Sequence, residues 1–304
     1  MTGHDKERNS GSASITMFAG KGGVGKTTCA AATALHYASD GRRTLAISTD
    51  ATPSLSHIFE AGDNDKPKKV SESLYINELG ADEVKQMWDA KFGREVYDVF
   101  STFVDLDYRE FVEFTTSILP GLREEFMVDY IRELGLNGQY SDVVWDTAPL
   151  GQTLALLQMP AVLLEHLKMA PRIYARLKPS SLSKEPVLKI IDRWRDLSAD
   201  EMEFLGNRVK FVIVTIPEAL AVEQLDSVFN ELDKYGLSVS EVIINNVIQE
   251  DDSAFLKARA AQQKLYLDII YTMCSKTKII ELPMFPYELK GLDRLREVEK
   301  VLFP

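Results

Sequence analysis

The sequence predicts an α/β protein in which a mostly parallel sheet is sandwiched by helices. Short apolar, β-branched runs alternate with helical patterns, and this alternation is typical of a parallel sheet covered on both faces. A glycine-rich loop follows the first run, and two long helical stretches separate later runs. These stretches predict a helical subdomain made of two insertions, at about 81–138 and 153–206. The expected strands are Ser14–Ala19, Thr44–Ser48, Leu74–Leu79, Val143–Trp145, Val209–Thr215, Val242–Ile244 and Lys278–Leu282.

The composition of the chain is that of a globular protein. Its 304 residues are 45% hydrophobic and 27% charged, which excludes disordered, collagen-like and coiled-coil classes. A formal net charge of −11 indicates that neither a nucleic-acid backbone nor an anionic membrane attracts the chain overall, so no nucleic-acid partner is expected. The most apolar stretch, Leu150–Ala170, is interrupted by Gln152, Pro160 and Glu165 and is too polar for a membrane span.

The cysteines and the N-terminal residues indicate the cellular compartment of the protein. Cys29 and Cys274 form neither a disulfide framework nor a metal-ligand spacing, and a cytoplasmic location is expected. Residues 1–13 have no apolar segment of the kind found in secretory signals, and they are predicted to be a disordered tail. Residues 14–304 are predicted to be a single domain that contains both insertions.

The two insertions carry apolar helix faces that must be covered. In the first, apolar residues between Phe111 and Leu134 repeat every three or four positions, and in the second, Leu154–Met169 has almost no polar side. Two alternatives stay open: the faces pack on each other, or they form a groove for an apolar client. The candidate groove residues are Phe111, Phe114, Phe126, Leu156, Leu163 and Leu167.

Phosphate binding is predicted by the loop between the first strand and an alanine-rich helix. The loop matches the pattern G-x-x-x-x-G-K-[ST], whose glycines let backbone N–H groups converge on phosphates at the positive end of a helix. Lys26 is expected to reach the β and γ phosphates, and Thr27 to supply a hydroxyl to Mg²⁺. The predicted fold is therefore a P-loop NTPase. The loop consists of Gly20, Lys21, Gly22, Gly23, Val24, Gly25, Lys26, Thr27 and Thr28.

Two aspartates come at the ends of predicted strands. Asp50 follows the strand at Thr44–Ser48, where open α/β sheets bind ligands, and it is expected to orient the attacking water; the alternative is that it caps the next helix. Asp146 ends the apolar run Val143–Trp145. This arrangement is typical of a Walker-B carboxylate, which holds Mg²⁺ directly or through water.

Lys21 adds a second cation to the loop. Loops written K-G-G-x-G-K-[ST] resemble those of the dimeric ATPases that include the nitrogenase iron protein, the MinD and ParA positioning proteins, and the arsenite-pump and tail-anchored-protein targeting ATPases. The resemblance implies a homodimer in which Lys21 reaches the nucleotide of the partner subunit. With this role for Lys21, the predicted catalytic residues are Lys21, Lys26 and Asp50.

From about Ile15 to the C-terminus, the chain most resembles the arsenite-pump and guided-entry targeting ATPases. The shared motifs are GKGGVGKTT at Gly20–Thr28, STD at Ser48–Asp50, DTAPLGQTLALLQMP at Asp146–Pro160, IPEALAVEQ at Ile216–Gln224, VIINN at Val242–Asn246, KARAAQQKLYL at Lys257–Leu267 and LPMFPYELKGLDRL at Leu282–Leu295.

The resemblance also implies roles for individual residues. Asp50 matches the catalytic aspartate of a first switch, and Asp146–Gln152 matches a second switch that relays the nucleotide state. Glu218 and Asn245 match nucleotide-binding positions, with Asn245 at the adenine, although an asparagine that ends a strand is otherwise a common turn residue. A loop that closes over the base would contain Pro283, Met284, Phe285, Pro286 and Tyr287 and run on to Lys290.

Three departures from the family pattern limit these implications. Ser253 and Leu256 stand where the targeting ATPases carry a CxxC that binds zinc between subunits, so zinc is not expected. The first switch reads Asp50-Ala51-Thr52-Pro53 instead of D-P-A-H. A short polar segment, Lys178–Lys184, replaces the Met- and Gly-rich insert that covers the client groove.

The implied function is that of a Mg²⁺-dependent ATP hydrolase. It would act as a homodimeric switch that binds the hydrophobic transmembrane segments of tail-anchored proteins and delivers them to a membrane receptor. One alternative is an arsenite-pump ATPase, although arsenite needs soft sulfur ligands and the chain has only two cysteines. Another is a MinD- or ParA-like positioning ATPase that would use the C-terminal helix, whose basic residues are balanced by acidic ones. A switch that binds ATP without turnover is the third.

Overall fold

The structure, a computed structural model, describes residues 12–50, 54–62, 66–101, 106–118, 122–174, 186–249 and 253–304. These residues fall into two compact units. The first takes its residues from 1–79, 133–153 and 208–304, and the second from 80–132 and 154–207. No helix within the described ranges combines the length and the apolar character that a bilayer span requires.

The first unit is built on a mostly parallel sheet, as the sequence predicts. Its strand order is β3-β4-β2-β5-β1-β6-β7-β8, and only the β3–β4 pair is antiparallel. In the central strands, Asp146 is in register with Phe18 on one side and with Ser48 on the other. The strands that carry the candidate site residues therefore end at the same edge. The strands are β1 (Ser14–Ala19), β2 (Thr44–Ser48), β3 (Lys68–Lys69), β4 (Leu74–Glu78), β5 (Asp142–Asp146), β6 (Val209–Thr215), β7 (Val239–Val247) and β8 (Lys278–Pro283).

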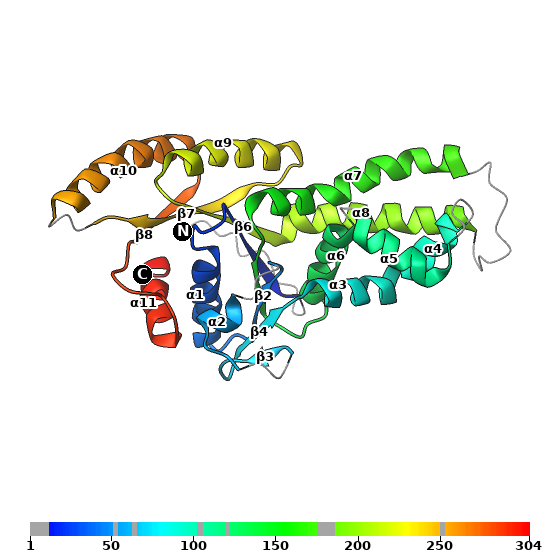
Figure 1. Cartoon of the computed structure of the whole chain (residues 1–304), viewed down its shortest axis with the longest axis horizontal. Coiled ribbons are helices and arrows are strands. Elements are labelled where there is room, and N and C mark those ends of the chain that lie inside the picture. The colour runs from blue at the N-terminus through cyan, green and yellow to red at the C-terminus, as the bar shows by residue number, and fades with distance from the viewer. Residues whose placement is uncertain are drawn as a thin grey trace, which may run out of the picture. The chain divides into compact units, whose positions relative to one another are not determined.

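Helices cover both faces of this sheet. In Figure 1, α9 and α10 lie together over one face, whereas α1 and α11 lie on the other. The alanines of α1 are buried in the core, and their small side chains allow the helix to approach the sheet closely. Leu295, Val298 and Leu302 of α11 join the same core, so this amphipathic helix packs on the protein. The helices are α1 (Lys26–Ser39), α2 (Leu55–Ile58), α9 (Ala219–Lys234), α10 (Ala254–Met273) and α11 (Leu292–Leu302).

The described residues of the second unit form helices joined by short non-helical connections (Figure 1). Its buried carboxylate Asp129 pairs with Lys91 and, at 3.2 Å, with Arg132. Glu95 accepts from Arg193 at 2.8 Å and from the indole of Trp194 at 3.1 Å, which ties α4 to α8. The helices of this unit are α3 (Ala81–Trp88), the π-helical η1 (Asp89–Gly93), α4 (Arg94–Phe100), α5 (Tyr108–Ile118), α6 (Leu122–Leu136), α7 (Leu150–Tyr174) and α8 (Val187–Arg208), of which the last three continue into the first unit.

The candidate groove residues are mostly inside this unit. Phe111, Phe126, Leu156 and Leu167 are buried. Leu163 is half-buried against a small cluster that includes Leu167 and residues of α8. Four of the six candidate groove side chains are therefore covered in this structure.

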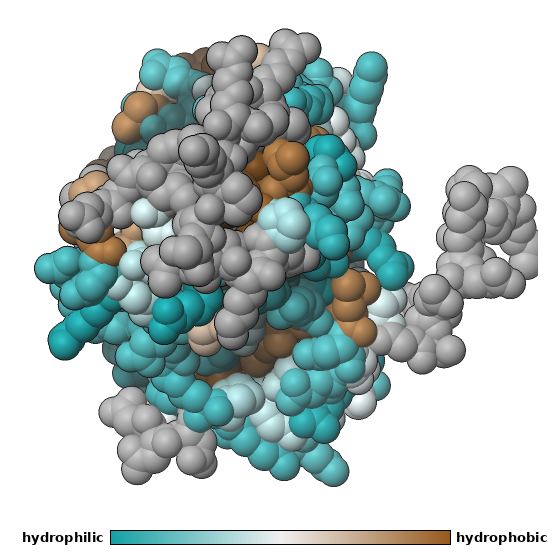
Figure 2. Space-filling view, turned by 90° about the vertical axis from the view of Figure 1, so that its right-hand side faces the viewer, coloured by the Kyte–Doolittle hydropathy of each residue, from teal (hydrophilic) through white to brown (hydrophobic). Residues whose placement is uncertain are grey.

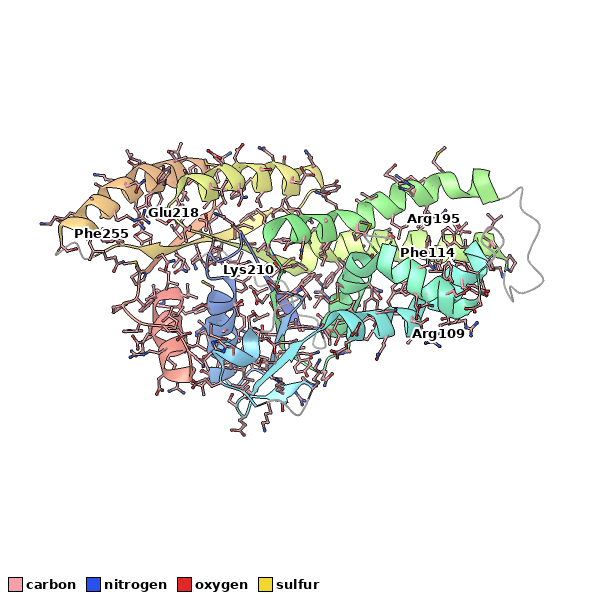
Figure 3. The ribbon with its side chains drawn as sticks, in the orientation of Figure 1. Arg109, Phe114, Arg195, Lys210, Glu218 and Phe255 are labelled. Atoms are coloured by element: carbon pink, nitrogen blue, oxygen red, sulfur yellow. The ribbon has the colours of Figure 1, made fainter. Side chains whose placement is uncertain are left out.

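Some apolar side chains of the second unit remain at the surface. Phe114 of α5, labelled in Figure 3, is 45% exposed. Val162, Met169 and Leu188 are also exposed. On the face of the molecule that Figure 2 shows, apolar residues appear as several small patches between hydrophilic ones. On this face, the described apolar side chains are therefore scattered.

Candidate active site

The glycine-rich loop connects β1 to α1, at the edge where the parallel strands end. A Cβ at Gly20 would lie 2.2 Å from the carbonyl oxygen of Val214 on β6. A Cβ at Gly25 would lie 2.3 Å from Nδ2 of Asn245 on β7. Both glycines also have positive φ, 155° and 97°, which side chains disfavour. The loop can therefore lie against the ends of β6 and β7 only because these residues are glycines.

Lys26 begins α1 and is buried. Its Nζ donates to the backbone oxygen of Lys21 at 3.2 Å, across the loop. Burial lowers the pKa of the Lys26 ammonium, and the carboxylates of Asp146 and Asp50 oppose this shift. A cation and two carboxylates therefore interact electrostatically at the start of α1, where the helix end favours an anion.

Asp146 ends β5 beside the loop. Thr27 Oγ1 donates to Asp146 Oδ2 at 2.8 Å. Burial raises the pKa of Asp146 to about 6, against the opposing effects of the Thr27 hydrogen bond and the Lys26 charge. Among the described residues, the buried atom Asp146 Oδ1 has no hydrogen-bond partner. A buried oxygen without a partner is costly, so this carboxylate is suited to a cation bound beside Thr27.

The donor set at this point consists of oxygen atoms. Thr27 offers a hydroxyl and Asp146 a carboxylate, and no described group of three or more His, Cys, Asp or Glu side chains could hold a metal ion. Mg²⁺ prefers such oxygen ligands, and it commonly keeps several waters and binds substrate phosphates. The residues present therefore fit a Mg²⁺ ion that is bound together with a nucleotide.

Asp50 lies two residues beyond the end of β2. Its backbone N–H donates to Ser48 Oγ at 3.3 Å, and its charge acts on Lys26. The next residues of the predicted first switch, Ala51, Thr52 and Pro53, lie outside the described residues. After them, Ser54 Oγ lies 3.4 Å from Thr27 Oγ1. Ser54 therefore lies beside the glycine-rich loop.

The predicted second switch is joined to the same loop. Leu150 donates its backbone N–H to Gly20 O at 3.2 Å. Thr147 Oγ1 donates to Phe18 O at 2.7 Å, and Thr153 Oγ1 donates to Ala148 O at 2.8 Å. The Leu150 and Thr147 bonds connect the segment at the start of α7 with the loop and with β1, and the Thr153 bond closes the first turn of that segment.

A cavity of about 420 Å³ opens next to the loop, within the usual size range for ligand sites. Asn245 Nδ2 donates to Val24 O at 2.8 Å, and Asn245 Oδ1 is buried with no partner among the described residues. This oxygen can accept from an exocyclic amine such as that of adenine. The cavity is lined by Gly23, Gly25, Thr27, Thr28, Ser54, His57, Ile58, Asn245, Asn246, Phe285, Tyr287, Glu288, Leu289 and Lys290.

The C-terminal loop predicted to cover the base contributes several of these lining residues. Met284 donates its backbone N–H to Val247 O at 2.9 Å, which holds the start of the loop on β7. Tyr287 packs its ring against the guanidinium of Arg294, whose carbon is 3.7 Å from the ring centroid. Pro283 ends β8, and Pro286 is exposed. The loop is thus held on β7 at its start and contacts α11 through Tyr287.

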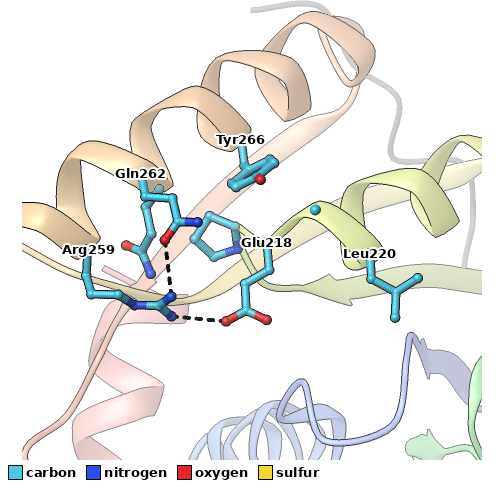
Figure 4. A pocket seen from close by; sticks show the side chains of 8 residues that line it. Glu218, Leu220, Arg259, Gln262 and Tyr266 are labelled. Carbon is cyan, nitrogen blue, oxygen red and sulfur yellow. Dashed lines mark hydrogen bonds and ion pairs between the residues drawn. The ribbon is translucent and has the colours of Figure 1, made fainter.

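Glu218 lies elsewhere in the first unit. It is at the N-cap position of α9 and pairs with Arg259 of α10 at 3.2 Å. Figure 4 shows this pair in a separate cavity of about 260 Å³, where Arg259 also donates to Gln262. In this chain, Glu218 faces α10, and a role at a nucleotide stays a prediction.

Ser253, at a position where the resemblance leads one to expect a metal-binding cysteine, has a structural role. Its hydroxyl accepts from the backbone N–H of Leu256 at 3.1 Å and caps α10. Ser253 is therefore the N-cap residue of α10, a position at which serine is common.

Sequence reasoning missed Glu78, at the end of β4. Its Oε1 accepts from the backbone N–H groups of Ser54, Leu55 and Ser56 at 2.7, 2.8 and 3.2 Å. Neither a motif nor a spacing indicated this contact. The one available signal was that a carboxylate ends a strand beside the strand that precedes Asp50.

Comparison with known proteins identifies relatives along almost the whole chain. A putative arsenical pump-driving ATPase of Chlorobaculum tepidum is 30% identical over 92% of this chain and 73% of its own length. ATPase GET3A of Arabidopsis thaliana is 29% identical over 91% of this chain and 80% of its own. ATPase GET3 of Kluyveromyces lactis is 29% identical over 93% and 87%.

The family comparison gives the same answer as these relatives and as the loop geometry. The family model of the anion-transporting ATPases matches residues 13–304. The matched range includes the glycine-rich loop, both aspartates and the C-terminal loop. The protein is therefore an ATPase, and it belongs to the anion-transporting ATPase family.

Proposed function

We propose that this ATPase is a Mg²⁺-dependent homodimeric switch that binds the hydrophobic transmembrane segments of tail-anchored proteins and delivers them to a membrane receptor. The contact between Thr27 and buried Asp146 beside the phosphate loop carries the catalytic part of the proposal. The relatives named GET3 and GET3A support the client part, together with motifs that resemble those of the guided-entry ATPases.

Each residue of the site has a chemical task in this proposal. The loop N–H groups and Lys26 bind the phosphates, and Asn245 accepts from the adenine amine. Thr27 and Asp146 hold Mg²⁺, which would neutralise phosphate charge when it is bound. Asp50 orients the attacking water and accepts its proton. Preorganised charges of this kind supply most of the stabilisation that phosphoryl transfer needs.

Lys21 is proposed to act on the nucleotide of the partner subunit. Lys21→Ala should therefore lower kcat about 10-fold or more, while the Kd for ATP changes only a few-fold, because the added cation interacts mainly with charge that develops in the transition state. Steady-state ATPase rates and nucleotide titrations measure the two quantities. Equal losses in both would count against a role across the dimer.

Mixing two inactive variants tests whether Lys21 acts across the dimer or within its own chain. In a mixed dimer of Lys21→Ala and Asp50→Asn chains, one site would keep its own Asp50 and receive Lys21 from the other chain. Random exchange of subunits should restore about a quarter of the parent activity, since half of the dimers are mixed and each has one intact site. If Lys21 acted within its own chain, mixing would restore nothing.

Client binding is proposed to need a rearrangement of the helical unit. Four of the six candidate groove side chains are buried here, so a transmembrane segment can reach them only if the helices separate. Apolar burial, at about 25 cal/mol per Å², would provide the binding free energy, and nucleotide would shift the equilibrium between the packed and the open arrangements.

Co-expression tests the client. A tagged transmembrane segment from a tail-anchored protein is expected to co-purify with the protein in stoichiometric amounts, and the recovery should differ between ATP and ADP. Phe114→Asp should reduce this recovery several-fold, because it puts a charge on an exposed apolar position of α5. Leu136→Asp is the matched control, since Leu136 is also about half exposed but belongs to the first unit. An active ATPase that recovers no segment would exclude this client.

Arsenite transport is the competing function, because relatives are named arsenical pump-driving ATPases. The environments of the two cysteines disfavour arsenite binding. Both cysteines are buried, and burial raises the pKa of Cys29 to about 12 and that of Cys274 to about 11. Arsenite binds thiolates, which these environments disfavour. A several-fold rise in ATPase rate on addition of arsenite would nevertheless favour the pump.

A further inference from the structure

Glu78 makes a contact that the catalytic proposal does not use. One oxygen of this side chain, Oε1, accepts three consecutive backbone N–H groups, those of Ser54, Leu55 and Ser56. The donors are 22 to 24 residues away in the sequence, and the acceptor is at the end of β4. The carboxylate therefore joins the start of α2 to the sheet.

The short helix α2 depends on this contact. It has four residues, too few to be stable in isolation, and the N–H groups of its first turn have no partners within the helix. Ser54, at the N-cap position, makes no side-chain cap bond within the described part of the helix start. Hydrogen bonds to a carboxylate are roughly twice as strong as neutral ones, so Glu78 provides the missing cap.

The two ends of α2 contact two different segments that line the cavity. At its start, Ser54 lines the cavity and its Oγ lies 3.4 Å from Thr27 Oγ1. At its end, Ile58 O accepts the backbone N–H of Gly291 at 2.9 Å, directly after the C-terminal loop. Glu60 then pairs with Lys290 at 3.7 Å. The helix is thus connected to the glycine-rich loop at its start and to the end of the C-terminal loop at its end.

Glu78 is also placed by the strand that precedes Asp50. In the parallel β2–β4 pair, Glu78 is in register with Ser48, and Leu79 donates its backbone N–H to Ser48 O at 3.2 Å. Asp50 follows Ser48 by two residues, and Ser54 follows Asp50 by four. The end of β4 therefore holds the backbone before Asp50, through Leu79, and the backbone at Ser54, through Glu78.

We propose that Glu78 is a positioning residue of the ATPase site, which holds Ser54 and α2 so that Asp50 and Thr27 keep their catalytic placement. This inference rests on the proposed catalytic role of Asp50. It assigns Glu78 no contact with nucleotide or metal, and its effect passes through the three N–H groups.

Two variants test the proposal. Glu78→Ala removes the acceptor and should lower kcat about 10- to 100-fold, the range expected when catalytic groups are misplaced by about 1 Å, while the Kd for ATP stays within about threefold. Glu78→Gln keeps an oxygen acceptor and the shape of the side chain, so it should recover most of the lost rate. In both variants, hydrogen exchange of the amides at 54–56 should be faster than in the parent, most of all in Glu78→Ala.

Glu241→Gln is the matched control. This carboxylate also sits on a strand of the same sheet, near the start of β7, and pairs with Lys210 and Lys278. It should leave both kcat and the exchange at 54–56 as in the parent protein.

Two results would overturn the proposal. One is an unchanged kcat in Glu78→Ala, and the other is a loss of ATP binding as large as the loss of kcat, which is the behaviour of a merely structural cap. Asp50→Asn, measured alongside, separates this proposal from the catalytic one. If Asp50→Asn retained turnover, the catalytic assignment would fail, whereas the exchange at 54–56 would still report whether Glu78 holds α2.

Discussion

Asp50→Asn is expected to lower kcat for ATP hydrolysis by about 10²- to 10⁴-fold, the usual contribution of a general base, while ATP binding stays within a few-fold of the parent. The amide that replaces the carboxylate has nearly the same shape but cannot accept a proton from the attacking water. The phosphate loop, Lys26 and Asn245 are untouched, so the contacts that bind ATP remain.

The measurement needs turnover and affinity on the same preparation. Single-turnover hydrolysis with excess protein gives the rate of the chemical step, and titration with a fluorescent ATP analogue gives the Kd. Asp40→Asn is the control, because Asp40 is an exposed aspartate at the other end of α1 and should have no effect on either quantity. A parent-like rate in Asp50→Asn would show that another group activates the water.

Replacing Asp50 should also change the pKa of Lys26, which tests whether the two charges interact. The Asp50 charge raises the pKa of Lys26 and opposes the effect of burial. The Lys26 pKa should therefore fall further in Asp50→Asn, and ATP affinity should begin to decline at a lower pH on the alkaline side than in the parent. The same pH dependence in both proteins would mean that the two charges are too far apart to interact.

The sequence predicts the sheet and the loop because their signals are local. Each long strand is an apolar, β-branched run. Gly20–Thr28 matches a phosphate-loop pattern whose functional residues are contiguous in the sequence. The two-residue strand Lys68–Lys69 was missed, since two lysines carry no strand signal and the pairing depends on neighbouring Tyr75 and Ile76.

Contacts between distant residues account for what the sequence could not show. Glu78 reaches backbone N–H groups, which leave no trace in residue type, so only the fold brings acceptor and donors together. Glu218 is an N-cap residue that pairs with a helix about 40 residues later. For the apolar insertion helices, periodicity identifies the apolar face but not what covers it. The burial of Phe111 and Phe126 in this structure had to come from the fold.

Asp146→Asn is expected to have opposite effects on function and on stability. Without the carboxylate, the Mg²⁺-dependent ATPase rate should fall by at least about 10²-fold, because an amide neutralises no charge at the metal. In the absence of nucleotide, however, the variant should be more stable than the parent at pH 7.5. The reason is that burial raises the pKa of Asp146 from 3.8 to about 6, so ionising this carboxyl in the folded protein costs free energy.

The pH dependence follows from the sign of this shift. Between pH 3.8 and about 6 the folded state binds more protons at Asp146 than the unfolded state, so the contribution of this residue to stability falls as pH rises. Above pH 6 the cost is complete, at most about 3 kcal/mol for a shift of about two units. Asparagine has no such cost. The stabilisation of the variant should therefore be largest at pH 7.5 and vanish below about pH 4.

Urea unfolding of the nucleotide-free proteins from pH 4 to 7.5 measures this difference, and the other end of the same strand supplies the comparison. Asp142 is a buried aspartate at the start of β5 that forms an ion pair with Arg42. Asp142→Asn should destabilise the protein by about 1–3 kcal/mol, since it weakens a charged hydrogen bond in a buried place. Two isosteric replacements on one strand would thus shift stability in opposite directions. If Asp146→Asn were less stable than the parent at pH 7.5, the folded protein itself would stabilise the ionised carboxylate, and the argument that Asp146 needs a bound cation would fail.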